Sequence, residues 1–242
     1  MECTPFLHAV LDFIFPPLCT VCRTFIPDAG PLHICAACRE GMPPIASPLC
    51  VSCGIPFTGA GEDHACGDCI SSRQHVDAAR AALVYEGASR DLIHSFKYRN
   101  KTHLRRPLAL LAIEKLSEFV HVRAPEVILP VPLHRKKLRA RGFNQAVLLG
   151  EIFSAHWNIP LDRHALRRIR WTEPQVNLSA RDRRENVKDA FSVLEPAVVS
   201  GRRVLLVDDV LTTGSTVEEC ARMLKRSGAF EVTVITVARA LD

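Results

Sequence analysis

The apolar residues in the second part of the chain fall into short unbroken runs, separated by longer stretches with helical periodicity. Unbroken runs of branched apolar residues are typical of strands covered on both faces of a parallel sheet. Strands are therefore expected at residues 79–85, 127–131, 204–207 and 232–238. Helices are expected at residues 89–99 and 103–122, and from near Phe143 and near Thr216. The alternation predicts an α/β fold of about five parallel strands with right-handed crossovers.

The first part of the chain lacks this periodicity and carries eight of the ten cysteines, in four CxxC pairs. The pairs are Cys19/Cys22, Cys35/Cys38, Cys50/Cys53 and Cys66/Cys69, separated by 12, 11 and 12 residues. Two such turns offer four thiolates to one tetrahedral ion, so the pattern predicts two structural zinc ions. Sequential pairing is the simplest arrangement, and a crossed arrangement also fits the spacing. A disulfide framework fits poorly, because no secretory signal is recognised and cytosolic thiols stay reduced.

The CxxC pattern ends and the apolar periodicity begins near residues 71–78, which predicts a domain boundary there. We expect a double zinc ribbon over residues 1–75 and an α/β domain over residues 76–242. The charged residues are also distributed unevenly between the two parts of the chain. Lys and Arg number 4 against 8 Asp and Glu in residues 1–80, and 27 against 18 in residues 81–242. A polyanionic partner is therefore expected on the basic second part, although ordinary solubility also explains such an excess.

No apolar run is long enough to cross a bilayer, so no transmembrane segment is expected. Residues 6–18 are apolar but interrupted by His8 and Asp12, which predicts a short amphipathic helix; a helix that touches the membrane is the alternative. We expect a cytoplasmic protein, with peripheral association at the inner membrane as an alternative.

The stretch from Arg203 to Thr216 combines an apolar run, two carboxylates and a hydroxyl-rich loop. Asp208 and Asp209 would lie at the carboxyl end of a strand, where α/β proteins bind ligands. The loop residues Thr212, Thr213, Gly214, Ser215 and Thr216 precede a helix whose positive end would attract a phosphate. Together they suit a ribose 5-phosphate, with carboxylates for the hydroxyls and N–H groups for the anion. The alternative is a buried strand, a solvated acid pair and a capped helix; no GxxxxGK[ST] loop occurs that would favour nucleotide hydrolysis.

A second segment, residues 135–141, is basic at five of seven positions and follows the strand expected at residues 127–131. We expect a loop here that binds pyrophosphate through Arg139 and Arg141, with Gly142 permitting a turn into the next helix. A solvated basic loop is the alternative. Two interpretations are also possible for Lys97: it is a residue of the site, or it is a charge exposed to solvent on its helix.

These motifs carry a family resemblance. Residues 203–216 resemble the phosphoribosyl pyrophosphate signature of type I phosphoribosyltransferases, and residues 139–145, spelled RARGFNQ, match a second motif. A third match is the loop pattern formed by Thr172, Gln175, Leu178, Ser179, Asn186, Ala190 and Phe191. With the four CxxC pairs, the chain resembles the ComF-type competence proteins. This implies a type I phosphoribosyltransferase-like parallel sheet with helices on both faces, preceded by a small Cys-rich zinc-ribbon domain.

The resemblance also implies roles for residues. Asp208 and Asp209 would hold the ribose hydroxyls and stabilise positive charge at the anomeric carbon, and residues 212–216 would hold the 5-phosphate. Arg139, Arg141, Gly142 and Lys97 would bind the pyrophosphate, which Mg²⁺ accompanies. A mobile flap would carry Arg181, Arg183 and Arg184 over it.

Two functions remain open on this reading. The first is a DNA-uptake factor that binds phosphoribosyl pyrophosphate and assists single-stranded DNA together with other uptake proteins. The second is a metabolic phosphoribosyltransferase that acts on a nucleobase or related acceptor, for which no acceptor pocket is recognisable. Aromatic residues make up 6% of the chain, and only Phe143 and Trp171 lie among the arginines, so no base-stacking groove is expected.

Overall fold

The computed structural model describes residues 16–27, 30–72, 74–172 and 180–241, so most of the amphipathic helix expected at residues 6–18 lies outside it. Its helices are α2 (Ala36–Glu40), α3 (Gly67–Ser71), α4 (Gly87–Tyr98), η1 (Thr102–Leu104), α5 (Arg105–Arg123), α6 (Arg135–Arg141), α7 (Gln145–Trp157), α8 (Ala180–Val187), α9 (Pro196–Val199) and α10 (Ser215–Arg226). Its strands are β1 (Ala78–Val84), β2 (Val127–Pro130), β3 (Leu166–Arg168), β4 (Phe191–Val193), β5 (Arg203–Leu211) and β6 (Glu231–Arg239).

The central sheet is parallel and has the strand order β1-β6-β5-β2. It therefore contains four described strands rather than the expected five, and β3 and β4 form a separate antiparallel pair. Strand β5 is longer than the apolar run that predicted it. It continues through both aspartates to Leu211, because β6 runs beside it and Asp208 stays in register with Thr236.

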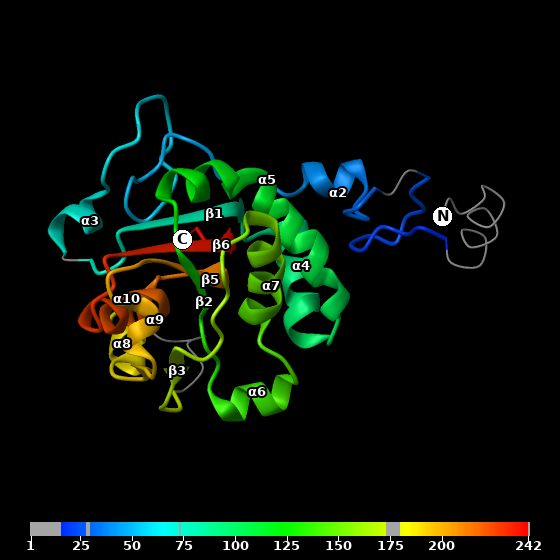
Figure 1. Cartoon of the computed structure of the whole chain (residues 1–242). Helices are drawn as coiled ribbons and strands as arrows, with labels where there is room; N and C mark the ends of the chain where they lie inside the picture. Colours follow the sequence, from blue (N-terminus) through cyan, green and yellow to red (C-terminus); the bar gives the residue numbers. More distant parts are fainter. Residues whose placement is uncertain (1–15, 28–29, 73, 173–179, 242) are drawn as a thin grey trace.

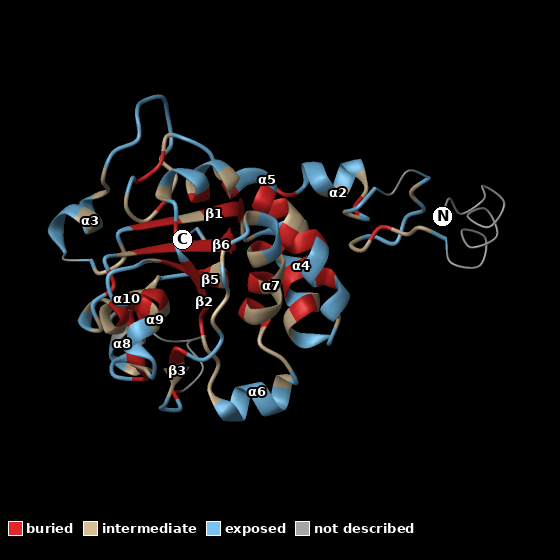
Figure 2. Ribbon diagram, in the orientation of Figure 1, coloured by how far each residue is buried: buried red, intermediate tan, exposed pale blue. Residues whose placement is uncertain are grey.

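Helices cover both faces of the sheet, as expected (Figure 1). Helices α4, α5 and α7 pack on one face, around fully buried side chains such as Phe96, Leu108 and Phe153. On the other face α10 packs over β5 and β6 through Val217, Cys220 and Leu224. The strands form the buried layer between them (Figure 2). No helix in the described ranges is both long and apolar enough to cross a membrane.

The cysteines gather into two groups of four, and the pairing is sequential. The groups are Cys19, Cys22, Cys35 and Cys38, and Cys50, Cys53, Cys66 and Cys69, with all sulfurs of a group within 4.8 Å of one another. The Cys22 and Cys35 sulfurs are 3.6 Å apart, and those of Cys53 and Cys66 are 3.8 Å apart. A tetrahedron with Zn–S bonds of about 2.3 Å has edges of about 3.8 Å, so both groups fit a structural zinc ion. The crossed arrangement is excluded.

The second ribbon is docked directly on the first strand of the sheet. The N–H of Ala79 donates to the carbonyl of Ser52 at 2.6 Å, and the Arg80 side chain donates to the carbonyls of Cys50 and Val51. Gly54 completes the contact. Its φ is +72°, and a Cβ there would lie 2.4 Å from the Ala79 oxygen, so only glycine allows the ribbon so close.

The link between the ribbons covers the outer edge of β1. Pro44 pairs antiparallel with Leu83, and backbone hydrogen bonds flank it from Ile45 N–H to Ala82 and from Val84 N–H to Pro43. The described residues of the first ribbon, by contrast, contact the α/β domain through a half-exposed ion pair to α5, between Arg39 and Glu114 at 2.7 Å, and through apolar contacts around Cys19 and Ile34. The two ribbons are therefore held to the α/β domain in different ways.

We expect metal analysis of protein purified without chelator to find two zinc ions per chain, because each four-sulfur group satisfies one tetrahedral ion. Replacing Cys22 by Ser should lower the ratio to about one, since it disables the first group alone. Retention of two ions by that variant, or none in the unaltered protein, would contradict the assignment.

Candidate functional site

The predicted ligand residues meet at the carboxyl edge of the sheet. Because all four strands are parallel, their carboxyl ends lie along one edge, and the loop after β5 opens there. A cavity of about 570 Å³ at this edge is lined from several elements. Its polar lining consists of Tyr85, Lys97, Tyr98, His134, Lys137, Gln145, Arg168, Trp171, Thr172, Asp208, Asp209, Thr212 and Thr216.

Lys97 of α4 lines this cavity and is not an exposed helix charge. Its Nζ lies 2.8 Å from Oδ1 of Asp209, and the two side chains are 16% and 3% exposed. Burial alone lowers the pKa of Lys97, but the carboxylate of Asp209 more than offsets this, so the pKa of Lys97 is raised. The other oxygen of Asp209, Oδ2, is buried and accepts no hydrogen bond from any described residue. A buried carboxylate oxygen left in this way is an acceptor for a ligand hydroxyl or a cation.

Asp208 has a different environment from its neighbour. Burial, and then repulsion from the Asp209 carboxylate, raise the pKa of Asp208 to about 7, although Lys97 opposes the shift. Its Oδ1 accepts a hydrogen bond from the N–H of Asp209 at 2.9 Å. The acid pair therefore holds one carboxylate neutralised by a lysine and one carboxyl that titrates near neutral pH. Adjacent carboxyl groups in such different environments are common in ligand-binding and active sites.

The hydroxyl-rich loop leads directly into α10, which begins at Ser215, one residue earlier than expected. Gly214 is the N-cap, with a φ of +77°, and contributes no capping side chain. The hydroxyls of Thr213 and Ser215 contact each other at 3.0 Å, which ties the loop together. The N–H groups at the start of a twelve-residue helix are thus left to an anion, with the helix dipole behind them.

The basic segment is helical, so the expectation of a loop at residues 135–141 is wrong. The Nδ1 of His134 accepts a hydrogen bond from the N–H of Lys136 at the start of α6, and Gly142 ends it with a φ of +84°. Lys, Arg, Leu and Ala are good helix formers, and the charge run concealed this. The turn at Gly142 is as expected.

The helix decides which basic side chains face the cavity. Lys137 lines it, and desolvation followed by repulsion from Arg141 and Lys97 lowers the pKa of Lys137. Arg139 is exposed on α6 and does not line the cavity. Arg141 reaches only its border, where Nη1 donates to Gln145 at 2.6 Å. Arg139 and Arg141 as pyrophosphate ligands therefore stay a prediction.

Arg168 and Thr172 complete the far wall. An Arg168 nitrogen donates to the Thr172 hydroxyl, and the guanidinium carbon of Arg168 lies 5.2 Å from the ring centre of Phe191. Thr172 belongs to the third family motif, whereas Arg168 and Lys137 were not singled out from the sequence. Gln175, Leu178 and Ser179 lie outside the described residues, and Arg181, Arg183 and Arg184 lie in α8, of whose side chains at these positions nothing is described.

Comparisons with known proteins agree with both halves of this description. The family model of the double zinc ribbon domain matches residues 10–70, and that of the phosphoribosyl transferase domain matches residues 163–242. Competence protein F of Haemophilus influenzae is 40% identical over 153 residues, which cover 62% of this chain and 67% of that protein. DNA utilization protein YhgH of Escherichia coli K12 is 40% identical over 156 residues, 62% of this chain and 66% of its own. Competence protein ComFC of Streptococcus pneumoniae is 24% identical over 66% of this chain and 67% of its own.

Solved structures resemble the chain more weakly. A crystal structure of adenine phosphoribosyltransferase shares 15% identity with a TM-score of 0.39, over 60% of this chain and 74% of that chain. Glutamine phosphoribosylpyrophosphate amidotransferase from B. subtilis shares 25% identity with a TM-score of 0.30, over 46% of this chain, which spans only 22% of that protein.

Replacing Asp208 by Asn should stabilise the fold at pH 8 by about 2–4 kcal/mol and change little at pH 4. The carboxyl has a folded-state pKa of about 7 against an ordinary value of 3.8, so the wild-type fold loses stability as pH rises between these values. Asp209→Asn is the matched variant, and should destabilise at pH 8 by about 3 kcal/mol because it leaves Lys97 buried without its partner. Denaturant unfolding of both variants at the two pH values measures this, and equal effects at pH 8 would contradict it.

Proposed function

We propose, because this chain belongs to the competence protein F family, that it binds phosphoribosyl pyrophosphate with Mg²⁺ and serves the handling of incoming single-stranded DNA. The first part of this proposal, the binding of phosphoribosyl pyrophosphate, rests on three groups of residues that line one cavity. The Lys97–Asp209 pair, the titrating Asp208 and the loop before α10 all line it. Each group suits a different part of the same ligand.

The ribose hydroxyls would donate to Asp208 and to the unpaired Oδ2 of Asp209. The 5-phosphate would accept from the N–H groups and hydroxyls of residues 212–216, at the positive end of α10. Lys137 and Arg168 offer positive charge to the pyrophosphate from α6 and β3, and Arg139 and Arg141 could join them only by a movement of α6. Mg²⁺ would neutralise pyrophosphate oxygens that these side chains leave free.

The mouth of the cavity supports the second part of the proposal. Two lining aromatic side chains are open to solvent, Tyr98 at 63% and Trp171 at 37% exposure. Each has a basic partner: Arg141 lies 5.1 Å from the ring centre of Tyr98, and Lys136 lies 5.6 Å from that of Trp171. Exposed aromatic rings beside cations are the usual means of binding single strands without sequence preference. Phe143, in contrast, packs against the buried Phe96 of α4, with the ring centres 5.5 Å apart and the ring planes tilted by 38°.

The names of the related proteins refer to competence and DNA utilization, and the basic second part of the chain suits a polyanion. We place the protein in the cytoplasm, where the cysteine groups would stay reduced and free to hold metal. Its partners there would be phosphoribosyl pyrophosphate, single-stranded DNA and other proteins of DNA uptake. A metabolic transferase with a nucleobase acceptor is the second candidate, supported by the same cavity.

Calorimetry should show Mg²⁺-dependent binding of phosphoribosyl pyrophosphate. Replacing Asp208 and Asp209 together by Ala should weaken it by about 2–4 kcal/mol, because two carboxyl acceptors for the ribose hydroxyls are lost while the loop of residues 212–216, the proposed phosphate loop, remains. Asp91→Ala, on the exposed side of α4, serves as the control and should bind as the unaltered protein does. Equal affinity of the double variant would reduce the motif to a strand and a capped helix.

Single-stranded DNA should bind the full chain at the mouth of the cavity, with an affinity that falls steeply with salt. Tyr98→Ala and Trp171→Ala should each weaken binding by about 1–3 kcal/mol, the worth of one stacked base. Fluorescence anisotropy of a labelled oligonucleotide across a salt series measures this.

Phe230→Ala is the matched control for the DNA experiment. Phe230 is 70% exposed but precedes β6, at the opposite edge of the sheet, so its loss should leave DNA affinity unchanged. Displacement of DNA by phosphoribosyl pyrophosphate would show a shared surface. Undetectable DNA binding at low salt would remove direct contact from the proposal and favour the metabolic transferase.

A further inference from the structure

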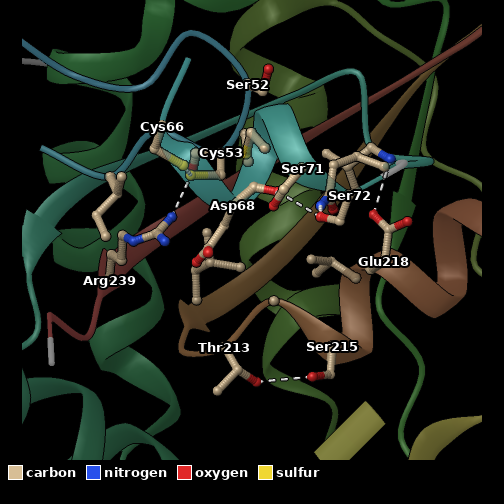
Figure 3. A pocket seen from close by; sticks show the side chains of 18 residues that line it. Ser52, Cys53, Cys66, Asp68, Ser71, Ser72, Thr213, Ser215, Glu218 and Arg239 are labelled. Carbon is tan, nitrogen blue, oxygen red and sulfur yellow. Dashed lines mark hydrogen bonds between the residues drawn. The ribbon is translucent and has the colours of Figure 1, made fainter. Parts of the chain in front are cut away.

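A second cavity, of about 620 Å³, lies between the second zinc ribbon and the phosphate loop (Figure 3). Its size is typical of small-molecule sites. The ribbon contributes Cys53, Cys66 and the residues of α3, and the sheet contributes the ends of β5 and β6. The loop divides the two cavities: Thr213, Gly214 and Ser215 line this one, and Thr212 and Thr216 line the first.

Arg239, the last residue of β6, is a cation at this cavity that forms no ion pair with a described carboxylate. The residue is 9% exposed, and the ion pairs between described residues do not include it. One nitrogen, Nη1, donates to the carbonyl of Cys53, whereas Nε is buried and has no acceptor among the described residues. Buried guanidinium donors left unpaired cost free energy, so the arrangement calls for an acceptor that enters the cavity.

The opposite side of the cavity supplies acceptors. Asp68 of α3 uses its backbone carbonyl for Ser71 and Ser72, while its carboxylate has no described partner. The other lining carboxylate, Glu218, is already occupied by His75, at 2.7 Å from the ring. The lining thus carries one buried cation and one exposed carboxylate, and this balance favours a neutral ligand over an anion, more so beside a cluster of zinc thiolates.

The walls between these polar groups are apolar. They are formed by Ile55, Val76, Ala79, Leu211 and Val217. Apolar side chains in the lining suit the faces of a flat ring, with its polar atoms at the rim. A ring carbonyl would accept from Arg239, and an adjacent ring N–H would donate to Asp68.

We infer that this second cavity binds a neutral oxo-heterocycle with a ring N–H beside its carbonyl, recognised by Arg239 and Asp68. Because Leu211 pairs with Arg239 in the sheet and the phosphate loop follows Leu211, a ligand here would contact the segment that holds the ligand of the first cavity. Occupancy of one cavity would then change affinity at the other, by the same factor in both directions. That coupling, unlike the binding itself, rests on the proposed function.

Ligand-observed NMR on the full zinc-loaded chain tests the binding in the absence of phosphoribosyl pyrophosphate. Uracil and hypoxanthine are the probes, and 1,3-dimethyluracil, which keeps the carbonyls but lacks the N–H groups, is the matched ligand. We expect saturable binding of at least one probe and at least about tenfold weaker binding of the dimethylated ring, the effect of one lost hydrogen bond. Failure of both probes to bind saturably, or equal binding of the dimethylated ring, would overturn the inference.

Variants locate the site. Arg239→Met keeps the length of the side chain and removes its donors, and should weaken probe binding about tenfold or more, whereas Arg226→Met on the exposed end of α10 should not. Zinc content is measured on each variant, because Arg239 also holds the Cys53 carbonyl. If Arg239→Met loses zinc, Asp68→Asn carries the test, with the same weakening expected. Unchanged probe binding in a zinc-replete variant overturns the assignment, even where phosphoribosyl pyrophosphate binds the first cavity normally.

Discussion

The buried ion pair between Lys97 and Asp209 sets the electrostatics of the whole sheet edge. It joins α4 to β5 across the cavity, and neither charge could be buried alone without a large desolvation cost. The pair keeps one carboxylate ionised, and that charge helps to hold the neighbouring carboxyl of Asp208 protonated up to about pH 7. Two adjacent residues of one strand, alike in their chemistry, therefore have different electrostatic surroundings.

The two ribbons, though alike in spacing, stand in different relations to this edge. The second is fastened to β1 through backbone carbonyls of its cysteine turn and contributes a wall to a cavity beside the phosphate loop. The first is attached through an exposed ion pair and apolar contacts, so its outer surface is more available. One cysteine group thus lies beside the candidate ligand site, while the other lies apart from it (Figure 1).

Local patterns predicted most of the fold. The strands, α4, α5 and the loop before α10 followed from periodicity and from short motifs, because each depends on neighbours in the chain. One error arose where tertiary contacts decide. The length of β5 depends on β6 beside it. The helix at residues 135–141 was missed for a local reason, because the run of charges concealed good helix formers. From the sequence, Tyr98 is only the end of a helix and Arg239 only the end of a strand. The fold places Arg141 beside the ring of Tyr98 and leaves Nε of Arg239 without an acceptor among the described residues.

The place of β6 in the sheet bears on how the chain reaches its fold. Strand β1 pairs with β6 and not with β5 or β2, so it cannot join the sheet until the last strand described has been made. About 150 residues separate the two strands, which at roughly 5–20 residues per second means on the order of ten seconds of synthesis. Throughout that interval the zinc ribbons can fold around their metals, but β1 keeps one open edge and only the short segment around Pro44 to cover the other. The nascent chain therefore carries an unpaired strand through most of its translation, which makes it a natural client for chaperones that shield such edges.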